Sequence, residues 1–510
     1  MTTSTPTTSS TAQHGRRPDH PRSRLASGPG FWWALLGVAA AGAVIGWWLP
    51  RGPVTSVQAV TVLLLTVLLG VAVGWATRTR LALLATPVVY LAAFEAARAR
   101  VEGPTVDGVH LGDAYGVLAF FAGRGVDALL MLFPLTVAVG VGLAVAARRG
   151  LRARPSWPAR IVLIVSVILV ALLGAALLRP ASTDAITGPD GEPVPDSIAE
   201  LVEVEIGGHE QSIMLRGRDV TAPVLLFLEG GPGGTAIGRI RNAGTDLEED
   251  FVVATWDQRG SGKSYDALEP VSTLTLEQMV RDTVQVSDYL RGRFDQDKIY
   301  LVGSSWGTVI GVLAVQRAPQ DYHAYIGTGQ MVDPFQTDQL MYAESLADAR
   351  EAGQDGRVEQ LLDLGPPPYE STLSYPIAIA SNPKWMNFEH GADYNPASEY
   401  PFSLMVGEYT LIEQLRGMAA IAETYSILYP QLAPIDFRSD VPSLDVPVHL
   451  VQGVHEAAGR EVLAREWFEL LEAPTKEYVA LDQSGHTPPY DEPGRFANMM
   501  AQIAAETSGP

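Results

Sequence analysis

The sequence contains no cysteine, and this absence narrows the chemistry open to the protein. Without thiols the chain forms no disulfide and no thiolate metal site, and it has no cysteine nucleophile. Lysine is absent from residues 1–180, where 16 arginines and six acidic residues give a net charge of +10. Residues 181–510 carry 20 basic and 51 acidic residues, a net charge of −31. So acidic a segment is not expected to bind nucleic acid, because phosphate contacts depend on lysine and arginine.

A complete phosphate-binding loop is also missing, although residues 259–264 read RGSGKS after an apolar stretch typical of a β-strand. The full motif has another glycine five positions before Gly262, where this chain has Asp257. It also needs a helix beginning at the lysine, whereas Lys263 runs into the proline-containing segment YDALEPVSTLT. The sequence therefore does not predict a nucleotide site.

Long apolar runs are abundant in the first 180 residues. Five of them, each close to the ~20 residues of a transmembrane helix, span residues 31–49, 57–76, 81–97, 126–147 and 161–178. The tryptophan pairs at 32–33 and 47–48 stand where interfacial aromatic residues belong. We predict a disordered tail over 1–30, a transmembrane domain in the lipid bilayer over 31–180, and a linker over 181–197.

Arginine placement predicts the orientation of these spans. Eleven arginines flank the ends on the side of the N-terminal tail, and five flank the opposite ends. Because cytoplasmic flanks carry the excess positive charge, the N-terminus is expected inside and everything after residue 180 outside the cytoplasm. The third run is short and contains Pro87, and its loss would invert this orientation. Glu95 and Asp127 lie near span ends, where we expect them to reach water.

Beyond the linker, strand and helix patterns alternate over residues 198–510. A hairpin turns at Gly207-Gly208, and six later strand patterns follow with helical patterns among them. Thr273 is a candidate cap for a helix near residues 274–294. Strands alternating with helices indicate an α/β fold with a mostly parallel sheet covered on both faces. Strand patterns stop between about residues 331 and 444, which predicts a helical cap over the carboxyl edge of the sheet.

The sequence GSSWG at 303–307 fits the G-x-S-x-G pattern of a nucleophile elbow and lies between a strand and a helix. Its serine, Ser305, is the candidate nucleophile, and an ordinary glycine-rich turn is the alternative. A serine needs a base, and only His486 lies in a loop after the final strand. Glu456 follows the preceding strand, where the acid of a Ser–acid–His order belongs. His455-Glu456 does not begin a zinc motif, because Gly459 replaces the second histidine, and no metal or cofactor is predicted.

Four motifs occur in order: GGPGG, WDQRGSGKS, GSSWG and SGHTPPYDEP. With them, residues 222–510 resemble the α/β-hydrolase fold, and specifically the proline iminopeptidase-like serine peptidases. The resemblance implies Ser305 as nucleophile, His486 as base, Glu456 as orienting acid, and an oxyanion hole from the backbone N–H groups of Gly231 and Trp306. It also makes DQRGSGKS a structural turn beside the active site. The chain departs from the family at Glu229, where the family has histidine, and at Glu456, where it has aspartate.

These observations favour a membrane-anchored serine aminopeptidase that cleaves short peptides. The alternatives are an esterase or amide hydrolase acting on small apolar substrates, and a membrane sensor or scaffold without activity. An aminopeptidase needs a carboxylate for the substrate ammonium, and Glu229 and Glu344 are the candidates. The alternative is that Glu229 braces the glycine loop and Glu344 faces solvent. The sequence predicts no oligomeric state.

Overall fold

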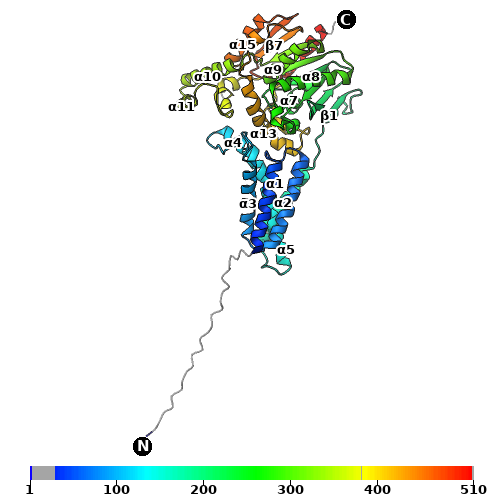
Figure 1. Cartoon of the computed structure of the whole chain (residues 1–510). Helices are drawn as coiled ribbons and strands as arrows, with labels where there is room; N and C mark the ends of the chain where they lie inside the picture. The colour runs from blue at the N-terminus through cyan, green and yellow to red at the C-terminus, as the bar shows by residue number, and fades with distance from the viewer. Residues whose placement is uncertain (3–28, 381, 508–510) are drawn as a thin grey trace.

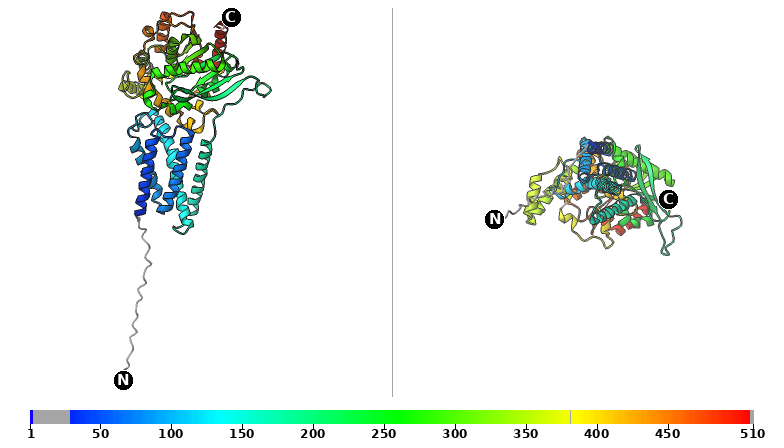
Figure 2. Two further views of the ribbon diagram at one scale, coloured as in Figure 1. Left: turned by 45° about the vertical axis from the view of Figure 1, so that its right-hand side comes forward. Right: turned by 90° about the horizontal axis from the view of Figure 1, so that it is seen from below.

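The computed structural model describes residues 1–2, 29–380 and 382–507, so nearly all of the predicted tail lies outside the described residues. A helical bundle and an α/β part are stacked end to end (Figure 1). The left view of Figure 2 shows the bundle helices side by side beneath the α/β part. The connection between α5 and α6 lies at the end of the bundle that faces away from the α/β part.

Within the described residues, the bundle contains five long helices, which we call rods because one of them consists of several helical segments. They are α1 (Pro29–Trp48), α2 (Ser56–Thr77), α3 (Ala82–Arg98), a continuous helix over Ala114–Arg148 that ends in α5 (Phe133–Arg148), and α6 (Trp157–Leu177). Within the described residues, four of these are long and apolar enough to cross a membrane, and α3 is not among them. With 17 residues, α3 rises only ~26 Å, short of the ~30 Å hydrocarbon layer.

The fourth rod begins earlier than the apolar run predicted. Its first segment is α4 (Ala114–Phe120). The N-cap of α4 is Asp113, whose side chain accepts a hydrogen bond from Gly116 N at 2.8 Å. Two π-helical turns, Phe121–Gly125 and Ala128–Leu132, then join α4 to α5 without a break. Hydropathy located the apolar core of this rod, whereas the polar cap determines where the helix begins.

Close backbone contacts hold the bundle together. A Cβ on Gly42 would lie 2.5 Å from Tyr90 O, and one on Gly46 would lie 2.5 Å from Phe94 O, so α1 and α3 run parallel and in direct contact. Gly74 meets α5 equally closely, with a Cβ position 2.2 Å from Val139 O. Small residues that let helix backbones touch are the usual basis of packing between helices in lipid.

The α/β part is built on an eight-stranded sheet, as the alternating pattern predicted. Its strands are β1 (Ile198–Ile206), β2 (His209–Gly217), β3 (Val224–Leu228), β4 (Val252–Trp256), β5 (Ile299–Ser304), β6 (Tyr322–Thr328), β7 (Val448–Gly453) and β8 (Lys476–Leu481). The order across the sheet is β1-β2-β4-β3-β5-β6-β7-β8. β2 is antiparallel to β1 and β4, and the remaining neighbours are parallel.

Helices cover both faces of this sheet. α8 (Leu276–Phe294), α9 (Trp306–Arg317) and α15 (Ala458–Leu470) pack on one face, and α7 (Ala236–Ala243) and α17 (Pro493–Thr507) pack on the other. The prediction that Thr273 caps α8 is wrong by two residues. Thr275 is the cap, accepting from Gln278 N at 3.1 Å, while Thr273 ends a preceding 3-10 turn.

Helical segments fill the chain between β6 and β7. They include α10 (Pro334–Glu351), α11 (Asp355–Leu364), α12 (Pro383–Met386), α13 (Leu411–Leu428) and α14 (Phe437–Asp440). Of these, α13 lies between the sheet edge and the helical bundle (Figure 1). Thr424 on α13 donates to Gly260 O at 2.7 Å, and its Cβ would be 2.8 Å from a Cβ on Gly233.

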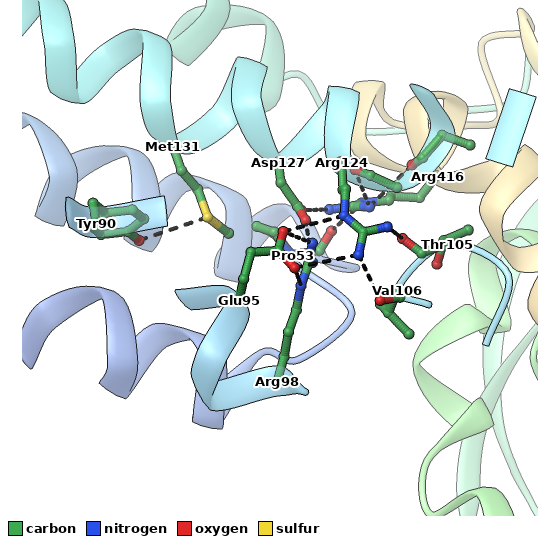
Figure 3. Close-up of polar contacts among 12 residues, drawn as sticks. Pro53, Tyr90, Glu95, Arg98, Thr105, Val106, Arg124, Asp127, Met131 and Arg416 are labelled. Atoms are coloured by element: carbon green, nitrogen blue, oxygen red, sulfur yellow. Dashed lines mark hydrogen bonds and ion pairs between the residues drawn. The ribbon is translucent and has the colours of Figure 1, made fainter. Parts of the chain in front are cut away.

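Buried ion pairs join α13 to the bundle (Figure 3). Asp127, only 5% exposed, accepts from Arg98 at 2.7 Å and also pairs with Arg416 of α13. Arg416 donates to the backbone oxygen of Pro53 at 3.0 Å as well. The expectation that Asp127 reaches water is therefore wrong: arginines from two parts of the chain, rather than solvent, compensate its charge. Glu95 is less buried and pairs with Arg98 and Arg124.

Candidate active site

Ser305 lies on a sharp turn between β5 and α9, with φ 53° and ψ −118°. Few residues other than glycine adopt a positive φ, and this one is held by a hydrogen bond from Ser305 N to Thr328 O at 2.9 Å. The glycines of GSSWG are sterically required here. A Cβ on Gly307 would lie 2.1 Å from Leu228 O, and one on Gly303 would lie 2.6 Å from Gly307 O. The turn is the strained elbow that exposes a serine hydroxyl.

The structure brings Ser305, His486 and Glu456 together from three separate loops. Ser305 Oγ lies 2.8 Å from His486 Nε2, and His486 Nδ1 lies 2.5 Å from Glu456 Oε2. His486 follows β8, and Glu456 follows β7, so all three residues stand at the carboxyl edge of the sheet. Gly329 makes room for the histidine, since a Cβ there would lie 2.8 Å from His486 Cε1. Hydroxyl, imidazole and carboxylate in this order form a relay that can remove a proton from the serine.

The charges around this relay set its protonation state. Burial would raise the pKa of Glu456, but His486, Arg460 and the N–H of Ala457 together bring it down to about 2. Burial lowers the pKa of His486, and Arg460 lowers it further against the opposing charge of Glu456. At neutral pH the carboxylate is therefore ionised and the imidazole is neutral, the state needed to accept a proton.

Arg460 was not predicted from the sequence. Its Nη1 lies 3.3 Å from Glu456 Oε1, so the carboxylate is held between the histidine and a guanidinium. The i,i+4 spacing at the start of α15 is the one signal that pointed to this pair.

The glycine loop after β3 faces the elbow. A Cβ on Gly230 would lie 3.0 Å from the Cβ of Ser305, which places the loop against the serine. Gly231 has φ 122°, and within the described chain neither its N–H nor that of Trp306 donates a hydrogen bond. Gln258 connects the two elements: it accepts from the Trp306 indole at 2.9 Å and donates to Glu229 O at 3.0 Å. This link was also missed, although Gln258 stands inside the quoted WDQRGSGKS segment.

The DQRGSGKS segment is a structural turn. Arg259 and Asp282, both fully buried, pair at 2.8 Å. Lys263 pairs with Glu413 of α13 at 3.1 Å, and Lys263 N donates to Asp257 at 2.9 Å. These contacts tie the turn to α8 and to α13.

Glu229 and Glu344, the two candidate partners of a substrate ammonium, have different surroundings. Glu229 is 2% exposed, accepts from Gly230 N at 3.0 Å and from Arg239 at 3.1 Å, and also binds Tyr490. These contacts favour its role as a brace of the glycine loop. Glu344, on α10 and 17% exposed, accepts from the Trp385 indole at 3.3 Å and from Ala458 N at 3.1 Å. Among the described residues, no hydrogen bond or ion pair links either glutamate directly to Ser305 or His486.

Comparison with known proteins identifies the family. Residues 224–350 match the family model described as serine aminopeptidase, S33. The probable aminopeptidase YbaC of Bacillus subtilis (strain 168) is 30% identical over 318 residues, covering 61% of this chain and 98% of that protein. The chain belongs to the serine aminopeptidase S33 family of α/β hydrolases. As an S33 member it has the fold and the peptidase-like hydrolase character of that family.

Solved structures similar to this S33 chain include two related to proline iminopeptidase. Proline iminopeptidase of Mycobacterium smegmatis is 17% identical with a TM-score of 0.45, covering 60% of this chain and 98% of its own. The proline iminopeptidase-related protein of Thermus thermophilus is 20% identical with a TM-score of 0.41, at the same coverage.

Within the described residues, no cluster of three or more His, Asp or Glu could hold a metal ion.

Proposed function

We propose that the chain is a membrane-anchored serine aminopeptidase of the proline iminopeptidase type, with Ser305, His486 and Glu456 as its catalytic triad. The observation that carries this proposal is the relay itself: a serine on a strained elbow, 2.8 Å from an imidazole that is 2.5 Å from a buried carboxylate. S33 membership and the relationship to a probable aminopeptidase support the peptidase reaction.

In this mechanism, Ser305 Oγ attacks the carbonyl carbon of the first peptide bond while its proton moves to His486 Nε2. Glu456 accepts from His486 Nδ1–H and stabilises the imidazolium. The backbone N–H groups of Gly231 and Trp306 donate to the developing oxyanion. His486 then protonates the leaving amine, and water, activated by the same imidazole, hydrolyses the acyl-enzyme.

We assign the substrate ammonium to Glu344 rather than Glu229. The charge of Glu229 is already compensated by Arg239, and its oxygens accept from Gly230 and Tyr490. Glu344 is partly exposed, and it accepts from the N-terminus of α15, two residues beyond Glu456. Among the described residues, Glu344 pairs with the exposed Lys384 at 3.7 Å. A carboxylate with this freedom can exchange its partner for a substrate ammonium.

A free amino terminus is expected to be decisive for turnover. Prolyl and alanyl arylamides should be cleaved at least tenfold faster than their N-acetylated forms, because acetylation removes the ammonium that pairs with Glu344, and losing a charge partner in a buried site costs roughly 2–5 kcal/mol. The measurement compares kcat/KM for each matched pair with the purified full-length protein. Equal rates on free and blocked arylamides, together with fast cleavage of small apolar esters, would favour the esterase or amide-hydrolase alternative.

Although α3 is too short to count as a span by length, it runs parallel to α1 within the bundle, so the chain still passes an odd number of times between the two ends. With this path, the arginine distribution supports an extracytoplasmic hydrolase part. A charged, membrane-impermeant prolyl arylamide given to cells stripped of any wall tests this sidedness. Equal turnover before and after permeabilisation is the expected result, and turnover that needs permeabilisation contradicts it.

The acid limb of the pH profile should lie below the ordinary histidine pKa of 6.5, because burial and Arg460 lower the pKa of His486. Arg460→Met removes a positive charge, so the pKa of His486 should rise and the acid limb should move to higher pH. The measurement is kcat/KM between pH 4 and 9, roughly the range over which histidine titrates. Arg465→Met, on the same helix and paired with Glu461, is the control that should not move the limb. An unchanged limb in Arg460→Met would remove Arg460 from this role.

A further inference from the structure

A groove runs along the membrane bundle at the end opposite the α/β part. It has a volume of about 570 Å³ and lies between α3, α5 and α6. Its walls are apolar over most of their length and include Leu83, Phe133, Val137 and Leu163. On α5 the lining extends from Phe133 to Ala144, a rise of roughly 16 Å, which suits an extended hydrocarbon chain.

The polar end of the groove carries uncompensated positive charge. Arg80, on the α2–α3 connection, and Arg152, on the α5–α6 connection, both line it. Over the described part of the chain, neither side chain takes part in a hydrogen bond or an ion pair. Burial, together with the nearby charge of Arg80, lowers the pKa of Arg152. Two guanidinium groups that line the same groove, without a carboxylate partner among the described residues, form a site for an anion.

The first turn of α6 adds to this positive field. Ser156, the N-cap, lines the groove, and its side chain makes no capping hydrogen bond. The N-terminus of a long helix carries partial positive charge and free N–H groups that favour a phosphate. On α5, every fourth residue that lines the groove is small: Thr136, Gly140 and Ala144. These residues lie on one face of the helix and leave the groove open.

We propose that this groove binds one anionic phospholipid, with its phosphate between Arg80 and Arg152 and an acyl chain along α5 and α6. The apolar walls account for the chain, and the paired guanidinium groups account for the phosphate and its negative charge. Basic pockets between membrane helices recognise anionic headgroups in this way. The site is separate from the triad, and it gives the bundle a lipid-binding role in addition to anchoring.

The experiment titrates the delipidated full-length protein in detergent with palmitoyl-oleoyl phosphatidylglycerol or phosphatidylcholine and counts bound lipids by native mass spectrometry. The first phosphatidylglycerol should bind at least about tenfold more tightly than phosphatidylcholine, because the latter has a neutral headgroup. Arg80→Gln/Arg152→Gln should abolish this preference. Arg149→Gln/Arg154→Gln removes the same charge from the same end of the bundle outside the groove, and it should keep the preference within twofold.

Ala144→Leu separates groove binding from attraction to a basic surface. It fills the groove and leaves both arginines in place, so it should weaken the first phosphatidylglycerol severalfold. Arylamide turnover, measured at the opposite end of the molecule, reports whether each variant is folded. Equal binding of the two lipids by the unmodified protein would overturn the proposal. The proposal would also be overturned if both double arginine variants lost the preference for phosphatidylglycerol equally. Unchanged binding of phosphatidylglycerol by Ala144→Leu would overturn it as well. If Arg80→Gln/Arg152→Gln does not fold, the proposal is still tested by comparing the two lipids on the unmodified protein and by the Ala144→Leu variant.

Discussion

Ser305→Ala is expected to lower kcat for aminoacyl arylamides roughly 10⁴- to 10⁶-fold, because the members of a serine triad act as a unit and the remaining two cannot form an acyl-enzyme. The same variant should not react with a fluorophosphonate probe. Substrate binding should change little, since the hydroxyl acts on the reacting carbon. The measurements are steady-state turnover and probe labelling of the full-length protein.

The neighbouring serine is a matched control for this substitution. Ser304 is fully buried, and among the described residues its hydroxyl has no hydrogen-bond partner. Ser304→Ala removes the same atom one residue away and should leave kcat within a few fold. Retained turnover in Ser305→Ala, or an equal loss in Ser304→Ala, would reject Ser305 as the nucleophile. Such a result would revive the non-catalytic sensor or scaffold alternative.

Arg259→Met is expected to lower the free energy of unfolding of the α/β part by about 3–5 kcal/mol. Arg259 and Asp282 are both fully buried and pair at 2.8 Å, so the substitution leaves a carboxylate in the interior without its cation. Gln211 and Gln278 still donate to Asp282, but neutral amides do not compensate its charge. Urea-induced unfolding of the detergent-solubilised full chain, followed by tryptophan fluorescence, measures the change.

Two variants test the reason for this loss. Arg259→Met/Asp282→Leu removes both charges and should recover a large part of the lost stability, because no unpaired carboxylate remains. Arg281→Met removes an arginine whose pair with Glu277 is exposed, and it should cost less than about 1 kcal/mol. A double variant as unstable as Arg259→Met would show that packing, rather than charge, is the main contribution of Arg259.

Local features of the sequence were sufficient for much of the α/β part. The alternation of strands and helices predicted the sheet, and the glycines around Ser305 marked the elbow, because close backbone contacts leave no room for a Cβ beside the serine. His486 and Glu456 followed from chain order, since residues after successive parallel strands meet at one edge of a sheet. The prediction of Thr273 as the cap of α8 was wrong, because the position of the cap depends on where the preceding 3-10 turn ends.

Contacts between residues that are far apart in the chain could not be predicted from local sequence patterns. Asp127 and Arg416 are 289 residues apart, and the sequence suggested that Asp127 would reach water. Arg460 beside Glu456 and Gln258 beside Trp306 are ordinary polar residues by pattern, and their roles depend on which loops meet. Hydropathy also could not decide the status of α3, whose 17 residues are too few for a span by length but lie in full contact with α1.

The sequence by itself determined the fold class of the α/β part, the serine on its elbow and the apolar character of the bundle. Periodicity, glycine sterics and hydropathy are properties of neighbouring residues, and they act before any long-range contact forms. Only the tertiary structure decided which charges are paired, which carboxylate is partly exposed, and where two arginines without an acidic partner among the described residues lie beside an apolar groove. Pairing in a low-dielectric interior depends on distances between segments that are far apart in the chain, and composition contains no such distances.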